Sequence, residues 1–364
     1  MYSPSTKRGL LGIDISSSAI KLVELKKKKG QYHVESYAVA PLPEGAASED
    51  VLNMVEPTAE VIKKTLKDSR TKLKQCALAV PASVVINKRL SIPKELPESE
   101  YEPHIRLEAE QYIPYPIEEV HLDFEVQGIS AYNPNSLEVV LVATRQENVD
   151  MRVAAAEMAG LKVELVDVES YVLERVIREL PPAFDTKILD DSQQAIGESS
   201  NIIALVDFGA TMSNMVVFEN NTMVFSQEHA FGGKQLTSEI MQRYGLSWEQ
   251  AGAAKKQGDL PESYIPEVLE PFKERMTQQV SRFLQLFYAS GQHNQVDKLL
   301  LAGGTALIPG IEEQIQNTLT IPTLLANPFT ACSLSNKVNP KRFSSDIPAL
   351  LVAAGLSLRG LDHG

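Results

Sequence analysis

Two segments of the chain share one pattern, and each carries an aspartate. The segments are residues 12–23, GIDISSSAIKLV, and residues 205–216, LVDFGATMSNMV. In both, Asp14 or Asp207 lies within an apolar run, small or hydroxyl-bearing residues follow, and a second apolar run completes the segment. The recurrence indicates that the chain contains two related halves, each opened by a β-hairpin.

The shared pattern fits the chemistry of phosphate and Mg²⁺. A tight hairpin of small residues lets backbone N–H groups approach phosphate oxygens, and serine and threonine hydroxyls add further donors. An aspartate at the end of the preceding strand can hold the water shell of Mg²⁺, which keeps most of its waters in proteins. We therefore expect Asp14 and Asp207 to hold Mg²⁺ through water. The residues expected to bind the phosphates of ATP are Ser16, Ser17, Ser18, Gly209, Ala210 and Thr211.

Lys21 lies on the second strand of the first hairpin, where its ammonium group would neutralise the β- and γ-phosphates. The alternative is a strand lysine that faces solvent. For each hairpin taken alone, the alternative is an ordinary turn with an aspartate. The second copy of the pattern and the glycine pairs elsewhere in the chain favour phosphate binding.

Two glycine pairs complete the expected nucleotide site. Gly303 and Gly304 follow the apolar run Leu299–Ala302, so the backbone can pass close to a flat ligand such as adenosine, and a helix start can supply free N–H groups. Gly232 and Gly233 open a second expected helix and would flank the nucleotide. The simpler interpretations are a β–turn–α corner and a plain helix start.

The elements that must position these residues form two halves. In the first half we expect strands over residues 10–15, 20–25, 32–39, 76–81 and 163–168, and helices over 51–69 and 170–180. In the second half we expect strands over 202–208 and 299–302, and helices over 235–244 and 271–291. The polar stretch 181–200 is the expected linker between the halves.

Residues 83–163 differ in character from the stretches that flank them, because five prolines punctuate their first half. Strands are expected there over 84–90, 120–127 and 137–144, and helices over 98–112 and 146–159. This is the size of a small inserted α+β subdomain. The first lobe is then expected to comprise 1–82, 164–200 and 336–364, and the second lobe 201–335.

Residues 26–30, KKKKG, form a charged turn between the second and third expected strands. A solvated hairpin tip is the simpler interpretation of this turn. Contact of the four lysines with a membrane surface is the alternative.

The composition limits which partners the protein can bind and which cellular compartment it is expected to occupy. A net charge of −12 and a pI near 5.1 disfavour nonspecific nucleic-acid binding, which needs clustered lysine and arginine. The two cysteines, Cys76 and Cys332, lie far apart without metal-site spacing, so a reducing cytoplasm is expected. No stretch approaches the roughly 20 apolar residues that span a bilayer. We expect a cytoplasmic protein that reaches the inner membrane through partners.

Together these elements resemble the superfamily of actin, Hsp70 and hexokinase along nearly the whole chain. The resemblance implies an α/β fold, an actin-like ATPase with ribonuclease H-like duplicated domains and a small inserted α+β subdomain. Within the superfamily the chain is identified as a member of the PilM family of type IV pilus assembly proteins. The stretches that carry this likeness are residues 12–21, GIDISSSAIK, residues 108–116, EAEQYIPYP, and residues 167–171, DVESY.

The resemblance also implies roles for individual residues and a partner. Glu169, with Asp167 as the alternative, would position the water that attacks ATP, and hydrolysis is expected to be slow or partner-dependent. The partner would be the cytoplasmic N-terminal peptide of a PilN-like inner-membrane protein. It would bind in a groove between the ATPase core and the inserted subdomain, with Tyr112, Ile113 and Tyr115 as groove residues, although these residues could equally form the core of the insertion.

Two other functions remain open on the sequence. The chain is similar in layout to FtsA-like cell-division proteins, which form filaments, but it ends without their basic amphipathic helix. A small-molecule kinase of the same fold would need a catalytic aspartate for a substrate hydroxyl, and no candidate stands apart from the two hairpin aspartates. Contacts with other pilus motor and platform proteins, twitching motility and self-association are further expectations from the resemblance.

Overall fold

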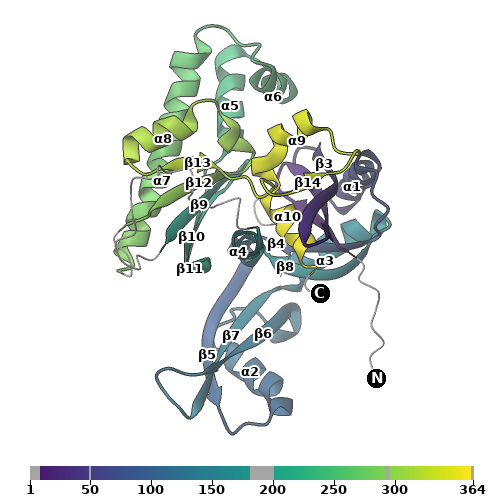
Figure 1. Ribbon diagram of the computed structural model, residues 1–364, viewed down its shortest axis with the longest axis vertical. Helices are drawn as coiled ribbons and strands as arrows, with labels where there is room; N and C mark the ends of the chain where they lie inside the picture. Colours follow the sequence, from purple (N-terminus) through teal and green to yellow (C-terminus); the bar gives the residue numbers. More distant parts are fainter. Residues whose placement is uncertain (1–8, 49–50, 181–200, 292–294, 362–364) are drawn as a thin grey trace.

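The computed structural model describes residues 9–48, 51–180, 201–291 and 295–361. They form two lobes, each built on one β-sheet, and a three-stranded subdomain that extends from the first lobe (Figure 1). The linker expected over 181–200 lies outside the described residues.

The sheet of the first lobe has the order β14-β3-β2-β1-β4-β8. Strands β1, β2 and β3 form an antiparallel meander, β4 and β8 continue the sheet in parallel with β1, and β14 pairs in parallel with β3. The strands are β1 Leu11–Ile15, β2 Ala19–Lys28, β3 Gln31–Pro41, β4 Gln75–Val80, β8 Lys162–Val168 and β14 Ser333–Leu334. The helices are α1 Val55–Ser69, α3 Gln146–Met158, α4 Glu169–Glu179, α9 Pro340–Asp346 and α10 Leu351–Leu358.

The two faces of this sheet are covered by different helices. Alternation along β1 sends Leu11, Ile13 and Ile15 to the face that α1 and α3 cover. Gly12 lies on the opposite face, where α10 packs so closely that a Cβ at this position would lie 1.9 Å from the carbonyl oxygen of Ala353. Glycine at this position therefore permits the close approach of the helix to the strand.

The second lobe repeats the arrangement of the first with the order β11-β10-β9-β12-β13. An antiparallel meander again leads into parallel strands. The strands are β9 Ile202–Phe208, β10 Ser213–Glu219, β11 Thr222–His229, β12 Lys298–Ala302 and β13 Thr323–Leu325. The helices are α5 Gly233–Tyr244, α6 Trp248–Gln257, α7 Glu270–Ala289 and α8 Ile311–Leu319. The order confirms the duplication indicated by the two aspartate segments.

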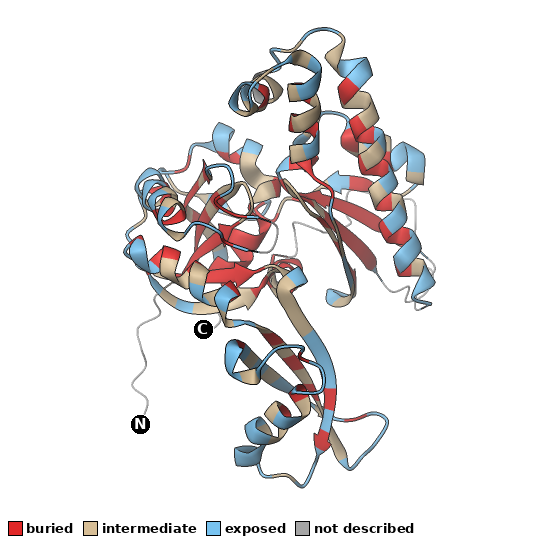
Figure 2. Ribbon diagram, turned by 180° about the vertical axis from the view of Figure 1, so that it is seen from behind, coloured by how far each residue is buried: buried red, intermediate tan, exposed pale blue. Residues whose placement is uncertain are grey.

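The lobes share one hydrophobic core. Helices α4 and α10 contribute their apolar residues to a cluster that also contains the inner faces of both sheets, including Val23 of β2 and Leu205 of β9. The backbone N–H of Met223 on β11 donates a hydrogen bond to Glu174 of α4 at 3.3 Å. Figure 2 shows that the central strands of both sheets, such as β1, β9 and β12, are buried along almost their whole length. The outer faces of the second sheet pack on α5 and α7 in a separate cluster.

The inserted subdomain is a sheet with the order β5-β7-β6 and a core of its own. Its elements are β5 Val85–Pro93, α2 Tyr101–Ala109, β6 Val120–Ile129 and β7 Ser136–Arg145. Helix α3, which falls inside the insertion expected over 83–163, packs instead on α1, β4 and β8. Its small residues Ala155 and Ala156 lie in the core of the first lobe. The sequence of α3 does not predict this packing, because its buried residues, Asn148, Arg152, Ala155 and Ala156, form no apolar stripe.

Candidate functional site

The two aspartate hairpins fold in the same register. Asp14 on β1 pairs with Lys21 on β2, and Asp207 on β9 pairs with Asn214 on β10. The ammonium group of Lys21 donates a hydrogen bond to Asp14 Oδ2 at 2.8 Å. The buried Oδ1 of Asn214 has no hydrogen-bond partner among the described residues. The hairpins are thus equivalent in geometry but differ in charge.

The two hairpin turns meet at the junction of the lobes. Ser17 Oγ and Thr211 Oγ1 lie 2.9 Å apart and share a hydrogen bond. Lys234 of α5 also reaches across the junction, where its Nζ donates to the carbonyl oxygen of Ser17 at 3.4 Å. The structure therefore brings together two turns that are about half a chain apart in sequence.

The three serines of the first turn have different surroundings. Ser16 Oγ donates to the carbonyl oxygen of Ala19 at 2.9 Å, which closes the turn. The backbone carbonyl of Ser18 accepts a hydrogen bond from the N–H of Leu42 at 2.9 Å. Of the three hydroxyls expected to contact phosphate, that of Ser17 is directed toward the other lobe.

Gly303 marks the closest approach of the third glycine-rich element to the second hairpin. It has a φ of +85°, and a Cβ there would lie 2.3 Å from both Asp207 Oδ1 and the carbonyl oxygen of Phe208. Thr305, two residues on, donates from Oγ1 to the carbonyl oxygen of Gly209 at 2.7 Å. Gly304 is exposed, and a Cβ there would meet nothing within 4 Å. The two glycines of this pair are therefore under different constraints.

The other glycine pair supports the second hairpin. The backbone N–H of Gly233 donates to the carbonyl oxygen of Gly209 at 3.1 Å, and that of Lys234 donates to Ala210 at 2.7 Å. A Cβ on Gly232 would lie 2.5 Å from the carbonyl group of Ala210. The first N–H groups of α5 are therefore hydrogen-bonded to the turn of the second hairpin. They stabilise the turn whose residues are expected to bind phosphate.

The two acidic residues of the connecting segment point to different places. Asp167 Oδ2 lies 3.1 Å from Arg359 Nε, and its Oδ1 accepts a hydrogen bond from the N–H of Val168 at 2.8 Å. Glu169 begins α4, and its carboxylate interacts electrostatically with Asp14 and Asp207. Glu169 is therefore the residue of the pair that lies with the hairpin aspartates.

The site holds more negative than positive charge. Burial raises the pKa of Glu169 to about 8, and the charges of Asp14 and Asp207 add to this rise. Burial likewise raises the pKa of Asp207 to about 6, against the opposing effect of Lys21. Burial alone would lower the pKa of Lys21, but Asp14 and Asp207 outweigh burial and leave it raised. These three carboxylates interact with the single ammonium group of Lys21, and the excess negative charge fits a further cation such as Mg²⁺.

The carboxylates do not by themselves enclose a metal ion. No three histidine, cysteine or acidic side chains in the described ranges are grouped closely enough to hold one directly. An ion bound here would therefore take most of its ligands from water and phosphate oxygens, as Mg²⁺ commonly does.

Three polar residues near the site were not predicted from the sequence. Asn214 occupies the position of Lys21 in the second copy of the repeat, so the alignment of the two segments could have revealed it. Lys234 follows the glycine pair directly and could have been found there. Lys273 of α7 pairs with Glu270 and lies next to Gly310 beyond the third element. Nothing in the helical pattern distinguishes it from a surface lysine.

The three residues expected in a partner groove divide between core and surface. Ile113 is 5% exposed and belongs to the core of the inserted subdomain, whereas Tyr112 and Tyr115 are each 44% exposed. Lys88 Nζ lies 5.9 Å from the centre of the Tyr112 ring, and the guanidinium of Arg145 lies 5.4 Å from that of Tyr115. The two tyrosines are therefore available at the surface beside cationic side chains.

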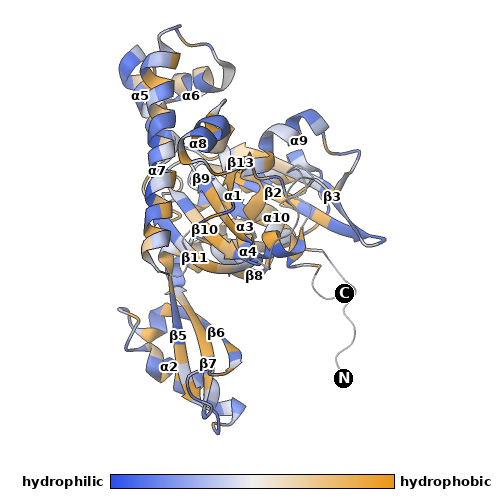
Figure 3. Ribbon diagram, turned by 60° about the vertical axis from the view of Figure 1, so that its left-hand side comes forward, coloured by the Kyte–Doolittle hydropathy of each residue, from blue (hydrophilic) through white to orange (hydrophobic). Residues whose placement is uncertain are grey.

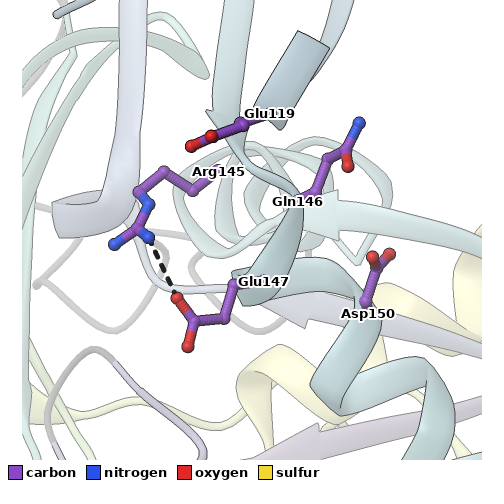
Figure 4. A pocket seen from close by; sticks show the side chains of 5 residues that line it. All are labelled: Glu119, Arg145, Gln146, Glu147 and Asp150. Atoms are coloured by element: carbon purple, nitrogen blue, oxygen red, sulfur yellow. Dashed lines mark ion pairs between the residues drawn. The ribbon is translucent and has the colours of Figure 1, made fainter. Parts of the chain in front are cut away.

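Arg145 connects Tyr115 to a cavity of about 290 Å³ where β7 passes into α3 (Figure 4). The cavity lies between the insertion and the first lobe, and Arg145 forms an ion pair with Glu147 at 3.2 Å within it. Its lining residues are Glu119, Arg145, Gln146, Glu147 and Asp150. A second cavity of about 410 Å³ lies where the second hairpin meets the residues that follow β4, and it is lined by Ala82, Ser83, Met212, Ser226, Gln227 and Glu228.

Comparison with known proteins shows which family has this architecture. The family model described as type IV pilus assembly protein PilM matches residues 12–361. The chain belongs to the PilM family. A chain of a solved PilM-PilN type IV pilus biogenesis complex is similar to this PilM family member at 26% sequence identity, over 98% of this chain and 99% of that chain, with a TM-score of 0.78.

The likeness extends to more distant structures. The ethanolamine utilization protein EutJ from Carboxydothermus hydrogenoformans matches with 15% identity, over 98% of this chain and 91% of that one, with a TM-score of 0.55. These matches confirm the actin-like ATPase fold expected of the PilM family member. In the part of the chain that the structure describes, no helix is long and apolar enough to cross a membrane.

Proposed function

We propose that this PilM family member is a cytoplasmic adaptor of the type IV pilus inner-membrane platform that binds both Mg²⁺-ATP and a PilN-like partner. The observation that carries the proposal is the likeness to a chain of a PilM-PilN complex over nearly the full length of both chains. The partner segment would be the cytoplasmic N-terminal peptide of the PilN-like protein. Through such partners the chain would lie at the inner membrane and serve pilus assembly and twitching motility.

The proposed nucleotide site lies between the lobes. Asp14 and Asp207 would hold Mg²⁺ through water, Lys21 would neutralise phosphate charge, and the backbone and hydroxyl groups of the two turns would bind the phosphates. The excess of carboxylate charge over ammonium charge supports this assignment. Gly303 and Gly304 would lie against the adenosine, and Gly232 and Gly233 would brace the second turn.

We propose that ATP acts mainly as a bound switch and that its hydrolysis is slow. Glu169 would position water, but a carboxyl group with a pKa of about 8 is largely protonated at neutral pH. A bound cation would lower that pKa and restore the charged form. Asp167 is engaged with Arg359 and is the weaker candidate for this role.

Helix α4 supplies a physical link from the proposed nucleotide site to the insertion. It begins at Glu169, beside the hairpin aspartates, and two residues later Tyr171 accepts a hydrogen bond at its hydroxyl from Asn87 of β5. A displacement of the start of α4 would therefore be transmitted to the inserted subdomain. This link supports a role of nucleotide state in partner binding.

The partner peptide would bind at the junction of the insertion and the first lobe. Exposed Tyr115 lies beside Arg145, which lines the cavity shown in Figure 4, and exposed Tyr112 precedes Tyr115 by three residues. Exposed aromatic side chains next to a hollow are common anchors for peptide recognition. Ile113 would support this surface from the core of the subdomain.

The test is a calorimetric titration of the N-terminal peptide of the PilN-like protein into this protein with Mg²⁺-ATP. We expect micromolar or tighter binding that Tyr115→Ala weakens about tenfold. The matched control is Tyr132→Ala, which removes a tyrosine that is 94% exposed in the same subdomain. Absence of peptide binding, with nucleotide still bound, would reject the adaptor proposal and favour a division-protein or kinase role.

A further inference from the structure

The hairpin of β2 and β3 projects from the first lobe and ends in a tight turn (Figure 3). Strand pairing continues to Lys28 and Gln31, so Lys29 and Gly30 alone form the turn. Their φ values of 52° and 82° are those of a type I′ turn, which matches the twist of the strands. The lysines at this end are therefore held on an ordered scaffold.

Five lysines lie at the end of this hairpin, and we call them the basic tip: Lys26, Lys27, Lys28, Lys29 and Lys337. Lys337 joins the group from the segment after β14, where its Nζ lies 2.9 Å from Glu35 of β3. The side chains of Lys26 and Lys28 remain 43% and 57% exposed even in their ion pairs. Lys27 and Lys29 are exposed and form no ion pair with any residue in the described ranges.

Two glutamates offset part of this charge. Glu35 pairs with Lys26, Lys28 and Lys337, which hold its pKa at about 2, so it remains ionised. Glu24 is buried and pairs with Lys26. His33 adds no charge near neutral pH, because burial and Lys28 lower its pKa. Five ammonium groups against two carboxylates leave the basic tip clearly positive on a chain whose net charge is −12.

We propose that the basic tip binds the anionic lipid headgroups of a membrane surface. Its lysines lie on a projecting hairpin and retain long, exposed side chains, which suits a diffuse, fluid layer of negative charge. Tyr32 lies beside Lys27, whose Nζ is 5.3 Å from the ring centre, and tyrosine is a residue favoured at the membrane–water boundary. The rest of the acidic surface is repelled by such a membrane, so the tip fixes which side of the molecule faces it.

The test is co-sedimentation of the full chain with lipid vesicles at low salt. One vesicle preparation contains phosphatidylglycerol and phosphatidylcholine in equal parts, and the other contains phosphatidylcholine alone. We expect binding to the anionic vesicles only, and we expect added salt to weaken it because screening shortens the range of the attraction.

Matched variants locate the binding surface. Lys27→Gln, Lys28→Gln and Lys29→Gln together should lower the partition onto anionic vesicles on the order of a hundredfold. The control is the triple variant Lys63→Gln, Lys64→Gln and Lys67→Gln, which removes the same charge from the exposed face of α1 and should retain most of the binding. Circular dichroism verifies that both variants fold.

Three outcomes would overturn the proposal. The first is absence of binding to anionic vesicles, and the second is equal loss in the two triple variants, which would indicate an effect of net charge. The third is equally tight binding of the tip to soluble polyglutamate, which would assign it to an acidic protein partner. The measurement needs neither nucleotide nor the PilN-like peptide, so it stands apart from the function proposed above.

Discussion

At the residue scale, the three carboxylates of the proposed nucleotide site have different partners. Asp14 is paired with Lys21, whereas Asp207 faces Asn214 across its hairpin and Glu169 stands beside both aspartates. Burial of carboxylates with a single ammonium partner makes at least one of them retain a proton at neutral pH. In the free protein, that carboxylate is Glu169.

The pH dependence of stability should reveal this proton. The pKa of Glu169 rises from 4.5 to about 8 in the folded protein, so the folded state binds more protons than the unfolded state between these values. The free energy of unfolding should therefore fall as pH rises from about 4.5 to about 8. We expect Glu169→Gln to be more stable than the unaltered chain at pH 8, on the order of 2 kcal/mol. Urea denaturation over a pH series measures both quantities.

Asp167→Asn is the control for this experiment, since it alters the neighbouring carboxylate that pairs with Arg359. It should keep the fall in stability across the same pH range. Asp207, whose pKa rises from 3.8 to about 6, contributes to the lower part of that range in every variant. An unchanged pH profile in Glu169→Gln would refute the assignment.

The sequence predicts which segments meet in the candidate site but not how their side chains pair. The repeat locates Asp14, Asp207 and both turns, because small residues and aspartates are needed at fixed positions in each hairpin. It does not reveal that Glu169, and not Asp167, lies with the aspartates. That choice depends on the direction of two side chains at the start of α4 and on Arg359, almost two hundred residues away.

At the scale of elements, the turn after β12 requires glycine at only one of the two positions of its glycine pair. Gly303 lies at φ +85° against Asp207 and Phe208, whereas Gly304 faces open space. Gly303→Ala should lower the free energy of unfolding by roughly 2 to 4 kcal/mol, because it adds both backbone strain and a steric clash. Gly304→Ala should change it by less than about 0.5 kcal/mol. Thermal or chemical denaturation of the two variants measures the difference.

Nucleotide titration extends this comparison to binding. A clash with Asp207 should also displace the proposed Mg²⁺ ligand, so Gly303→Ala should bind Mg²⁺-ATP more weakly than Gly304→Ala. Equal stability and equal binding in the two variants would show that the backbone at Gly303 accommodates a side chain, contrary to the observed geometry.

Elements with a clear hydrophobic period are predictable from the sequence, and those with a uniform composition are not. The opening strands and α7 appear where the period of apolar residues predicts them, and α1 does so except that it begins at Val55, four residues after the start expected over 51–69. Helix α10, LVAAGLSL, is apolar on all sides and so shows no face that would reveal its neighbours. Its position between the sheets depends on Gly12 and on Ser357, whose hydroxyl donates to Leu10 O and accepts from the N–H of Leu25.

At the scale of the whole molecule, a ligand held by both lobes should stabilise both at once. Free Mg²⁺-ATP at 100 times its Kd should raise the free energy of unfolding by about 2.7 kcal/mol. Lys21→Met should reduce this increment to less than about 1 kcal/mol, since it removes the cation of the first hairpin. Lys64→Met, at an exposed position of α1, should retain it. Differential scanning calorimetry with and without nucleotide provides the increments.

This prediction is tied to Mg²⁺ as well as to ATP. Chelation of the metal should remove most of the increment, because the carboxylates Asp14, Asp207 and Glu169 would then repel the phosphates. An increment that survives both chelation and Lys21→Met would place the nucleotide elsewhere on the molecule.

The division of the first lobe along the chain affects how the protein is made. Strand β1 and helix α10 pack directly on each other, yet the ribosome synthesises the whole second lobe between them. The second lobe, contiguous from β9 to β13, can complete its sheet while the first still lacks a central helix. We therefore expect the second lobe to fold during translation, although it is encoded later than most of the first. Until α10 emerges, the nascent first lobe would expose an apolar sheet face and rely on chaperones to keep it from aggregating.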